Sequence, residues 1–285
     1  MVGLFWYNAA MTFFLLYTCI GAIGGVVVLF FALRLLTSPS NNRDWAPDQK
    51  ILPYGVIEGD NVSLFNIRNF AYISVTKYKE QYYDKIFDVR TIKRVWYVVE
   101  PFSGIPGSAH TFLSFEFEEG VFLAFSIEIR KRKGQEFHPI KGLFNQYELM
   151  YVIADENDVV KLRSNYRKDP VYVYPARAPQ EKVKMLFLHM VKSANMLREH
   201  PQFYNTITHN CTTEIVRHIN AITPKSVPLF SLAILFPEYS DKLAYNLGLL
   251  DTTLSFEKAR EKFRINERAE KYKDDPHFSG KIREG

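Results

Sequence analysis

The pattern of apolar and polar positions changes twice along the chain, and its first part is almost entirely apolar. From Leu4 to Leu36, only Asn8, Arg34 and a few hydroxyl groups interrupt the apolar run. A membrane-spanning helix needs about 20 apolar residues, so this run predicts a transmembrane helix within residues 1–37. No Lys or Arg precedes the run, whereas a signal peptide that is cleaved begins with a basic segment. We therefore expect a permanent membrane anchor.

A polar segment follows the anchor, and beyond it the apolar positions alternate as they do in β-strands. Residues 38–50 are rich in Pro, Asn and Asp, which is typical of a linker. From residue 51 onward, short β-rich runs recur between turn residues. They predict strands over residues 62–65, 70–75, 94–99, 110–117, 121–129, 147–154 and 171–174. The charged turn at residues 118–120 joins two of these runs into a hairpin.

Helical periodicity replaces the alternation in the second half of the chain. Residues 180–199 carry apolar side chains on one face, and residues 211–219 do the same over a shorter length. Ser255 precedes a charged helical stretch as an N-cap. Residues 261–285 predict a polar tail, frayed from about residue 271 onward. This order favours an α+β domain over residues 51–260, with helices packed beside a mostly antiparallel sheet.

The charge balance excludes little, but it isolates one basic cluster. The chain has 36 Lys and Arg against 31 Asp and Glu, a net charge of +5 at pH 7. The basic residues are dispersed, and neither a zinc-binding spacing nor a nucleic-acid motif nor a Gly-rich phosphate loop occurs. We therefore predict no nucleic-acid partner, no metal and no cofactor. Arg130, Lys131 and Arg132 are either a solvated hairpin end or a contact for anionic lipid headgroups.

The candidate chemistry centres on one of the two cysteines. Cys19 lies in the apolar run and Cys211 in the domain, so no intramolecular disulfide is expected. Thr208 and Asn210 are good N-cap residues, which places Cys211 at the start of a helix. The open amides and the dipole of a helix N-terminus favour a thiolate. A lone Cys is commonly a buried small apolar residue, but the polar neighbours here favour a nucleophile.

A thiolate nucleophile needs a base, and the sequence offers His110 at the start of a predicted strand. Ser126 and Glu128 share a face of the next strand, and either side chain can orient the imidazole. Two simpler readings stay open: His110 as a structural histidine and Glu128 as a surface charge. His209 and His218 are closer to Cys211 in the sequence, but their positions relative to the helix start do not aim them at the sulfur.

The order of these motifs resembles a known group of cysteine enzymes. "AHTFLSFEF" followed by "NCTTEIVRHI" is similar to the circularly permuted papain-like superfamily, in its lecithin:retinol acyltransferase branch. More specifically, "NIRNFAYIS", "GLFNQYELMYVIADENDVVKLRSNYR" and "YNTITHNCTT" resemble the Lnb N-terminal periplasmic domain family, whose namesake is a lipoprotein N-acyltransferase. The resemblance implies that Cys211 is the nucleophile and His110 the base. It leaves the choice between Ser126 and Glu128 open.

The sequence therefore yields three competing functions. The first is a membrane-anchored cysteine acyltransferase that takes an acyl chain from a phospholipid or diacylglyceryl group and passes it to the N-terminal amine of a lipoprotein. Its oxyanion would rest on the Cys211 amide and the Asn210 side chain. The second is a cysteine hydrolase of the same fold, a lipase, thioesterase, amidase or peptidase. The third is a non-catalytic envelope scaffold.

The expected location also rests on the resemblance. Arg34, Arg43 and Lys50 follow the anchor, and the positive-inside rule would put the domain in the cytoplasm. The family instead implies a bacterial inner-membrane anchor with its domain in the periplasm. We follow the family, because one short charge asymmetry is weaker evidence than several long motifs.

Overall fold

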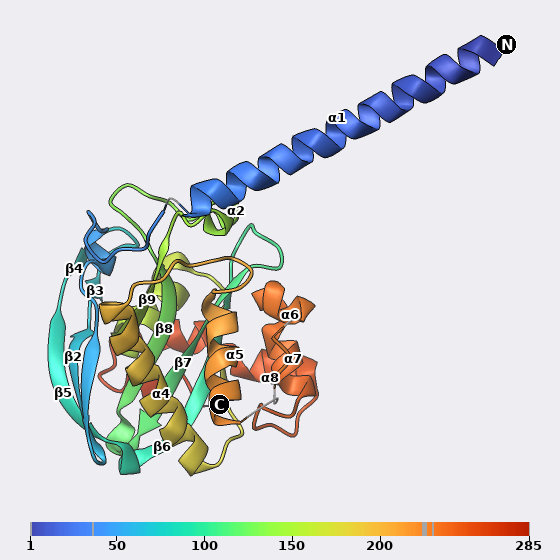
Figure 1. Ribbon diagram of the computed structural model, residues 1–285. Helices are drawn as coiled ribbons and strands as arrows, with labels where there is room; N and C mark the ends of the chain where they lie inside the picture. The colour runs from blue at the N-terminus through green and yellow to red at the C-terminus, as the bar shows by residue number, and fades with distance from the viewer. Residues whose placement is uncertain (1, 36, 224–226, 230, 285) are drawn as a thin grey trace.

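A single long helix stands apart from the body of the molecule (Figure 1). The computed structural model describes residues 2–35, 37–223, 227–229 and 231–284, with the side chains of residues 2–10 and 33–35, Arg34 among them, lying outside the described residues. Helix α1 (Val2–Leu35) includes a window, Met11–Ala32, that is long and apolar enough to cross a membrane and is not buried inside the protein. Its length and composition agree with the predicted anchor.

The body is built on one large sheet. Its strand order is β1-β2-β9-β8-β7-β6-β10, and β5 pairs with β2 outside this path. The strands are β1 (Tyr54–Glu58), β2 (Asn61–Arg68), β5 (Tyr82–Asp88), β6 (Ile92–Pro101), β7 (Ala109–Phe117), β8 (Phe122–Arg130), β9 (Glu148–Ala154) and β10 (Tyr172–Pro175). All pairings are antiparallel except one, the parallel contact of β2 with β9 at Arg68 and Ala154. The sheet is therefore mixed at this point rather than wholly antiparallel.

Most of the predicted strands are confirmed, and the central hairpin is the clearest case. Strands β7 and β8 pair in register, with Leu113 opposite Phe125, and the charged turn η3 (Glu118–Gly120) joins them. The run at residues 70–75 forms only the two-residue strand β3 (Ala71–Tyr72), which pairs with β4 (Tyr78–Lys79) in a separate small sheet. Strands β1 and β5 were not predicted, because their burial is too shallow to leave a clear apolar alternation.

Helices cover both faces of the sheet (Figure 1). They are α2 (Pro139–Leu143), α3 (Glu156–Lys161), α4 (Gln180–Glu199), α5 (Cys211–Ile222), α6 (Leu232–Leu235), α7 (Ser240–Asn246), α8 (Phe256–Phe263), α9 (Asn266–Lys271) and α10 (Phe278–Lys281), with short turns η1 (Pro47–Gln49), η2 (Val89–Thr91) and η5 (Pro237–Tyr239) and a π-helical segment, η4 (Leu162–Arg167). Helices α4 and α5 pack on one face, where Phe187 joins the aromatic core of the hairpin. Helices α3, α9 and α10 close the other. The domain is thus α+β, as expected.

The C-terminal residues do not form the frayed tail that the sequence predicts. Ile265, Ala269, Phe278 and Ile282 are buried in the core on the second face of the sheet. The guanidinium of Arg283 pairs with the buried carboxylate of Glu156 at 2.5 Å. The prediction was wrong because these apolar residues are few and lie on short helices, so no helical periodicity spans them.

We expect Phe278→Ala to destabilise the domain by about 3–5 kcal/mol, the usual cost of removing a buried phenyl ring. Phe278 is fully buried between the sheet and its neighbours, although only seven residues follow it in the sequence. Phe236→Ala is the matched control, because that ring is half exposed. Urea unfolding of the full chain in detergent micelles measures both; equal losses would show that the C-terminal helices do not stabilise the domain.

Candidate active site

Cys211 is the first residue of helix α5, as the sequence predicts. Asn210 caps the helix. Its side-chain oxygen accepts a hydrogen bond from the backbone N–H of Thr213 at 2.8 Å, and the Thr213 hydroxyl accepts one from the backbone N–H of Asn210 at 2.8 Å. The backbone carbonyl of Asn210 accepts a hydrogen bond from the backbone N–H of Glu214. The amides of Cys211 and Thr212 are therefore the open donors of this helix end among the described residues, and they lie beside the thiol.

The thiol itself lies against the start of strand β7. Cys211 is 8% exposed, and its Sγ lies 4.0 Å from the carbonyl oxygen of Ala109, the residue before His110. Sγ also lies 3.8 Å from the hydroxyl of Thr212. Cys211 and His110 line the same cleft, although no hydrogen bond joins Sγ to the imidazole in the described structure. The long-range pairing of helix and strand that the sequence suggested is thus present.

Both candidate partners help to hold His110. Ser126 is hydrogen-bonded to the imidazole, and Glu128 is hydrogen-bonded to Ser126. Nε2 of His110 lies 2.7 Å from the Ser126 hydroxyl, and this hydroxyl donates to Oε1 of Glu128 at 2.8 Å. Because Ser126 has one proton and gives it to Glu128, Nε2 must be the donor in its bond with Ser126. This assignment places the imidazole proton on Nε2 and leaves a lone pair on Nδ1. An imidazole in this tautomer can accept a proton at Nδ1.

A buried guanidinium sets the charge of this group. Arg163, on η4, donates to Oε1 of Glu128 at 3.0 Å and to Oε2 of Glu100 at 2.6 Å. Burial and the positive charge of Arg163 lower the pKa of His110 to about 3, although Glu128 acts in the opposite direction. Burial favours protonation of Glu128, but the charges of Arg163 and Arg68, the neighbouring His110 and the hydrogen bond from Ser126 together outweigh burial and hold the pKa of Glu128 below its ordinary value. At neutral pH the site therefore holds a neutral imidazole beside an ionised Glu128.

The cleft has one apolar and one charged wall. Its empty volume is about 1080 Å³ including the open mouth. Phe102, Phe137 and Leu235 contribute the apolar wall. The charged wall includes Arg163 and the pair of Arg68 with Asp158, whose two hydrogen bonds are both 2.8 Å long. A ligand with an apolar part and an anionic or polar part fits such a surface.

The basic cluster does not act as one unit. Arg130 is 2% exposed; its guanidinium stacks on the ring of Trp45 at 4.1 Å and donates to the carbonyls of Gln49 and Lys50. This residue cannot reach a lipid headgroup, so its prediction as a headgroup ligand is corrected. Arg130 instead fastens the linker to the domain. The alternation of residues along a strand cannot predict this role, because the contacts are with a distant segment of the chain.

The other predicted residues occupy different places. Lys131 lines the cleft, and Arg132 is partly exposed, 3.9 Å from Glu148. The Asn210 side chain is committed to its cap, since its amide nitrogen also donates to the carbonyl of Thr206 at 2.8 Å. His209 pairs with Glu214 at 2.9 Å. His218 is buried against Tyr151 and His189, away from the cleft.

Sequence reasoning missed Glu100, Arg163 and Arg167, which complete the charged network. Glu100 directly follows the apolar run at residues 95–99 of β6 and is fully buried, with Arg163 and Arg167 as its ion-pair partners at 2.6 and 3.5 Å. A carboxylate at the end of an apolar run was the available signal. The two arginines had none, because the π-helical turn that aims them at Glu100 has no recognisable sequence pattern.

Comparison with known proteins agrees with the motifs. A family model described as the Lnb N-terminal periplasmic domain matches residues 78–238, more than half of the chain. The matched range includes His110, Ser126, Glu128 and Cys211. Comparisons with curated proteins and with solved structures gave no match.

We expect the imidazole of His110 to stay neutral between pH 8 and pH 5, with its proton on Nε2. The physical reasons are its burial beside Arg163 and its bond to Ser126. Nitrogen NMR of full-length protein labelled at its histidines measures both properties, with His110→Gln to assign the signal. In Ser126→Ala, the loss of the hydroxyl should allow a mixture of the two neutral tautomers. A midpoint near the ordinary value of about 6.5, or a proton on Nδ1 in the unmodified protein, would contradict this description of the site.

Proposed function

The chain belongs to the Lnb N-terminal periplasmic domain family, and from this membership and the cleft geometry we propose that it is a membrane-anchored cysteine acyltransferase of the bacterial envelope. One observation carries the proposal. Cys211 begins a capped helix in the same cleft as a neutral His110, whose Nε2 is bound through Ser126 to Glu128. Nucleophilic catalysis requires a thiol, a base with a free lone pair, and residues that orient the base.

In the first half-reaction, Nδ1 of His110 takes the thiol proton of Cys211, and Sγ attacks the carbonyl carbon of a lipid ester. The oxyanion that forms is stabilised by the open amides of Cys211 and Thr212 at the start of α5. Asn210 contributes by holding this helix end through its cap. When the intermediate collapses, the C–O bond breaks, and the departing alkoxide takes the proton from the imidazolium. The products are a thioester on Cys211 and a lipid with a free hydroxyl.

In the second half-reaction, the N-terminal amine of a lipoprotein attacks the thioester carbon. Nδ1 of His110 accepts one proton of the amine, the C–S bond breaks, and the thiolate regains the proton. The products are an N-acylated lipoprotein and the original thiol. His110 begins and ends this cycle neutral, which is the resting state that its lowered pKa gives it.

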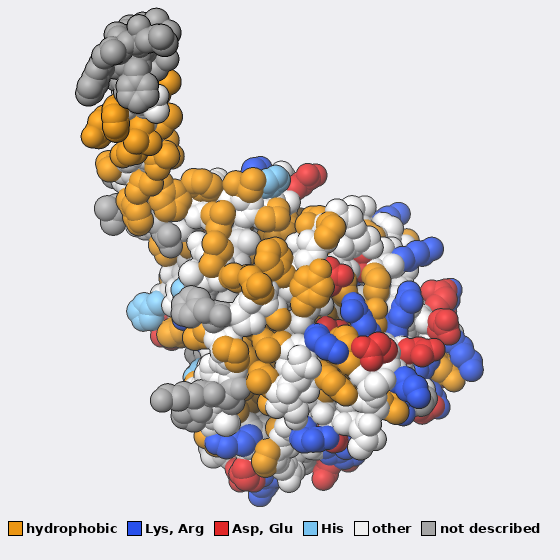
Figure 2. All heavy atoms as spheres, turned by 90° about the vertical axis from the view of Figure 1, so that its right-hand side faces the viewer, with side chains coloured by type: hydrophobic (Ala, Val, Ile, Leu, Met, Phe, Trp, Pro, Cys, Tyr) orange, Lys and Arg blue, Asp and Glu red, His pale blue; other side chains and the backbone are white. Residues whose placement is uncertain are grey.

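The neighbourhood of the anchor supports a lipid substrate. The ring of Phe30 on α1 packs edge-on against the ring of Phe144, just after α2, with 5.1 Å between centroids. Apolar side chains also gather below α1 on the face that carries α6 and α7 (Figure 2), where Leu232, Phe236 and Tyr239 are exposed. Such a patch next to an anchor is suited to contact with a bilayer. Lys131 and Arg132 are then the remaining candidates for headgroup contact.

We further infer that the domain is of the permuted papain-like type and works on the periplasmic side of the inner membrane. A nucleophile at the start of α5, packed against a strand that supplies the base, supports the first inference. The family's periplasmic description and the apolar helix α1 support the second.

Hydrolysis by the same site is the second candidate, and one observation favours it. Arg68, Arg163 and Arg167 make one wall of the cleft strongly polar, and a wet cleft admits water as the acyl acceptor. Transfer requires that the amine reach the thioester before water does. The two functions share the first half-reaction and differ only in the acceptor.

We expect the full chain, incubated in detergent with phospholipid and a diacylglyceryl lipopeptide, to add one acyl chain to the free amine of the peptide. Cys211→Ser should abolish the gain in peptide mass. His110→Ala should slow it by about 10²–10⁴-fold, the usual contribution of a general base. Intact-mass spectrometry of both enzyme and peptide is the measurement.

The same experiment separates the alternatives. Release of free fatty acid with an unmodified peptide would replace transfer with hydrolysis. If enzyme, peptide and lipid all stay unchanged while a thiol reagent labels Cys211, this pair of substrates is wrong. No labelling of Cys211 in the folded protein would leave the non-catalytic scaffold as the explanation.

A further inference from the structure

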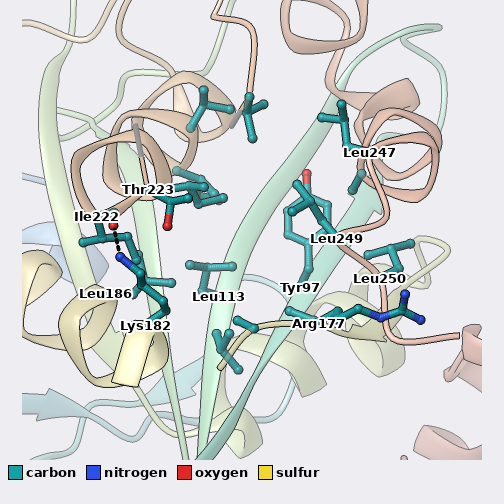
Figure 3. A pocket seen from close by; sticks show the side chains of 18 of the residues that line it. Tyr97, Leu113, Arg177, Lys182, Leu186, Ile222, Thr223, Leu247, Leu249 and Leu250 are labelled. Carbon is teal, nitrogen blue, oxygen red and sulfur yellow. Dashed lines mark hydrogen bonds between the residues drawn. The ribbon is translucent and has the colours of Figure 1, made fainter. Parts of the chain in front are cut away.

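A second cavity, separate from the cleft, lies between α4, α5, α7 and strands β6 and β7 (Figure 3). Its empty volume is about 1070 Å³ including its mouth. Leu113, Leu186 and Leu249 surround the empty centre, and nearly all other lining atoms are also apolar. Apolar walls of this kind suit a hydrocarbon group.

One polar side chain that lines this cavity lies beside the nucleophile. Thr212, which lines the cavity, has its hydroxyl 3.8 Å from Sγ of Cys211. The hydroxyls of Tyr97 and Ser240, which also line it, are bonded to each other at 2.7 Å. A hydrocarbon chain in the cavity would therefore have one end close to the sulfur. The Thr212 hydroxyl is also hydrogen-bonded to the hydroxyl of Thr111, at 2.9 Å.

The cations at the rim do not make this an anion site. The ammonium of Lys182 is bonded to the carbonyl of Ile222, the last residue of α5 (Figure 3). The guanidinium of Arg177 lies 3.6 Å from the carboxylate of Asp251. Both charges have partners in the protein, so the cavity offers a ligand apolar contact and little else.

We propose that this cavity holds the fatty acyl chain that Cys211 receives. This inference rests on the proposed acyltransferase function, because it assigns a place to the chain of that reaction. The chain extends from the sulfur past Thr212 and lies between α5 and α7. The polar cleft is then left for the headgroup and for the incoming amine, so one site can bind two chemically different parts of its substrates.

Photolabelling tests the cavity without any need for catalysis. The probe is a 16-carbon fatty acid with a diazirine at its methyl end, added to full-length Cys211→Ala protein in detergent. We expect labelled peptides from α5 and α7. Ala244→Trp, which adds an indole to the cavity wall on α7, should lower this labelling at least fivefold. Ala221→Trp, on the exposed side of α5, is the matched control and should leave it unchanged.

Different outcomes would contradict the assignment of the cavity and the proposed acyltransferase function. Labelling confined to α1, or labelling that survives in folded Ala244→Trp, would overturn the cavity assignment. If Ala244→Trp does not fold, Ala244→Leu replaces it and should reduce labelling by a smaller factor. Labelling of α5 and α7 in a protein that never forms a thioester would support the cavity and reject the acyltransferase. A thioester formed at equal rates from 8- and 16-carbon donors would support the acyltransferase and reject the cavity.

Discussion

The buried guanidinium of Arg163 is the interaction on which the cleft depends. It joins the ends of two strands, through Glu100 on β6 and Glu128 on β8, and it also donates to the carbonyl of Val159 on α3. Charges buried in protein are tolerated when they are paired and hydrogen-bonded, and are costly when a partner is lost. Removing Arg163 would leave Glu128 without its guanidinium partner and Glu100 with only the longer pair to Arg167. The fold and the charge of the site therefore depend on one residue.

The same guanidinium gives Glu128 and His110 different protonation states. Glu128 is kept ionised, and His110 is kept neutral, although the two are joined through Ser126. A resting ion pair of thiolate and imidazolium is therefore disfavoured, because the lowered pKa of His110 opposes protonation of the imidazole. The site instead suits a base that accepts a proton only as the sulfur attacks. This distinguishes the proposed chemistry from that of cysteine enzymes whose histidine is already charged at rest.

The sequence predicted the central hairpin, helices α4 and α5, and the partners Cys211, His110, Ser126 and Glu128, because local periodicity and capping residues determine these features. The order of the hydrogen bonds, from His110 to Ser126 and from Ser126 to Glu128, could not be predicted. Strand alternation places both side chains on one face, but it does not say which of them contacts the imidazole. Arg163 was missed because its role depends on a π-helical turn, and Arg130 was misjudged because its stacking on Trp45 joins distant segments. The buried C-terminal helices were missed for the same reason: their contacts are tertiary.

The segment that the sequence predicts as a linker is held to the domain. Asn41 donates to the carbonyls of Leu197 and Arg198, Trp45 is buried, and Arg43 pairs with Glu148 at 2.6 Å. With α1 in a bilayer, a fastened linker allows no swinging on a loose tether, and it fixes the height of the thiol above the lipid surface. The protein would then meet its substrates by lateral diffusion in a shared membrane, and lipids or lipoproteins in a facing membrane would stay beyond its reach.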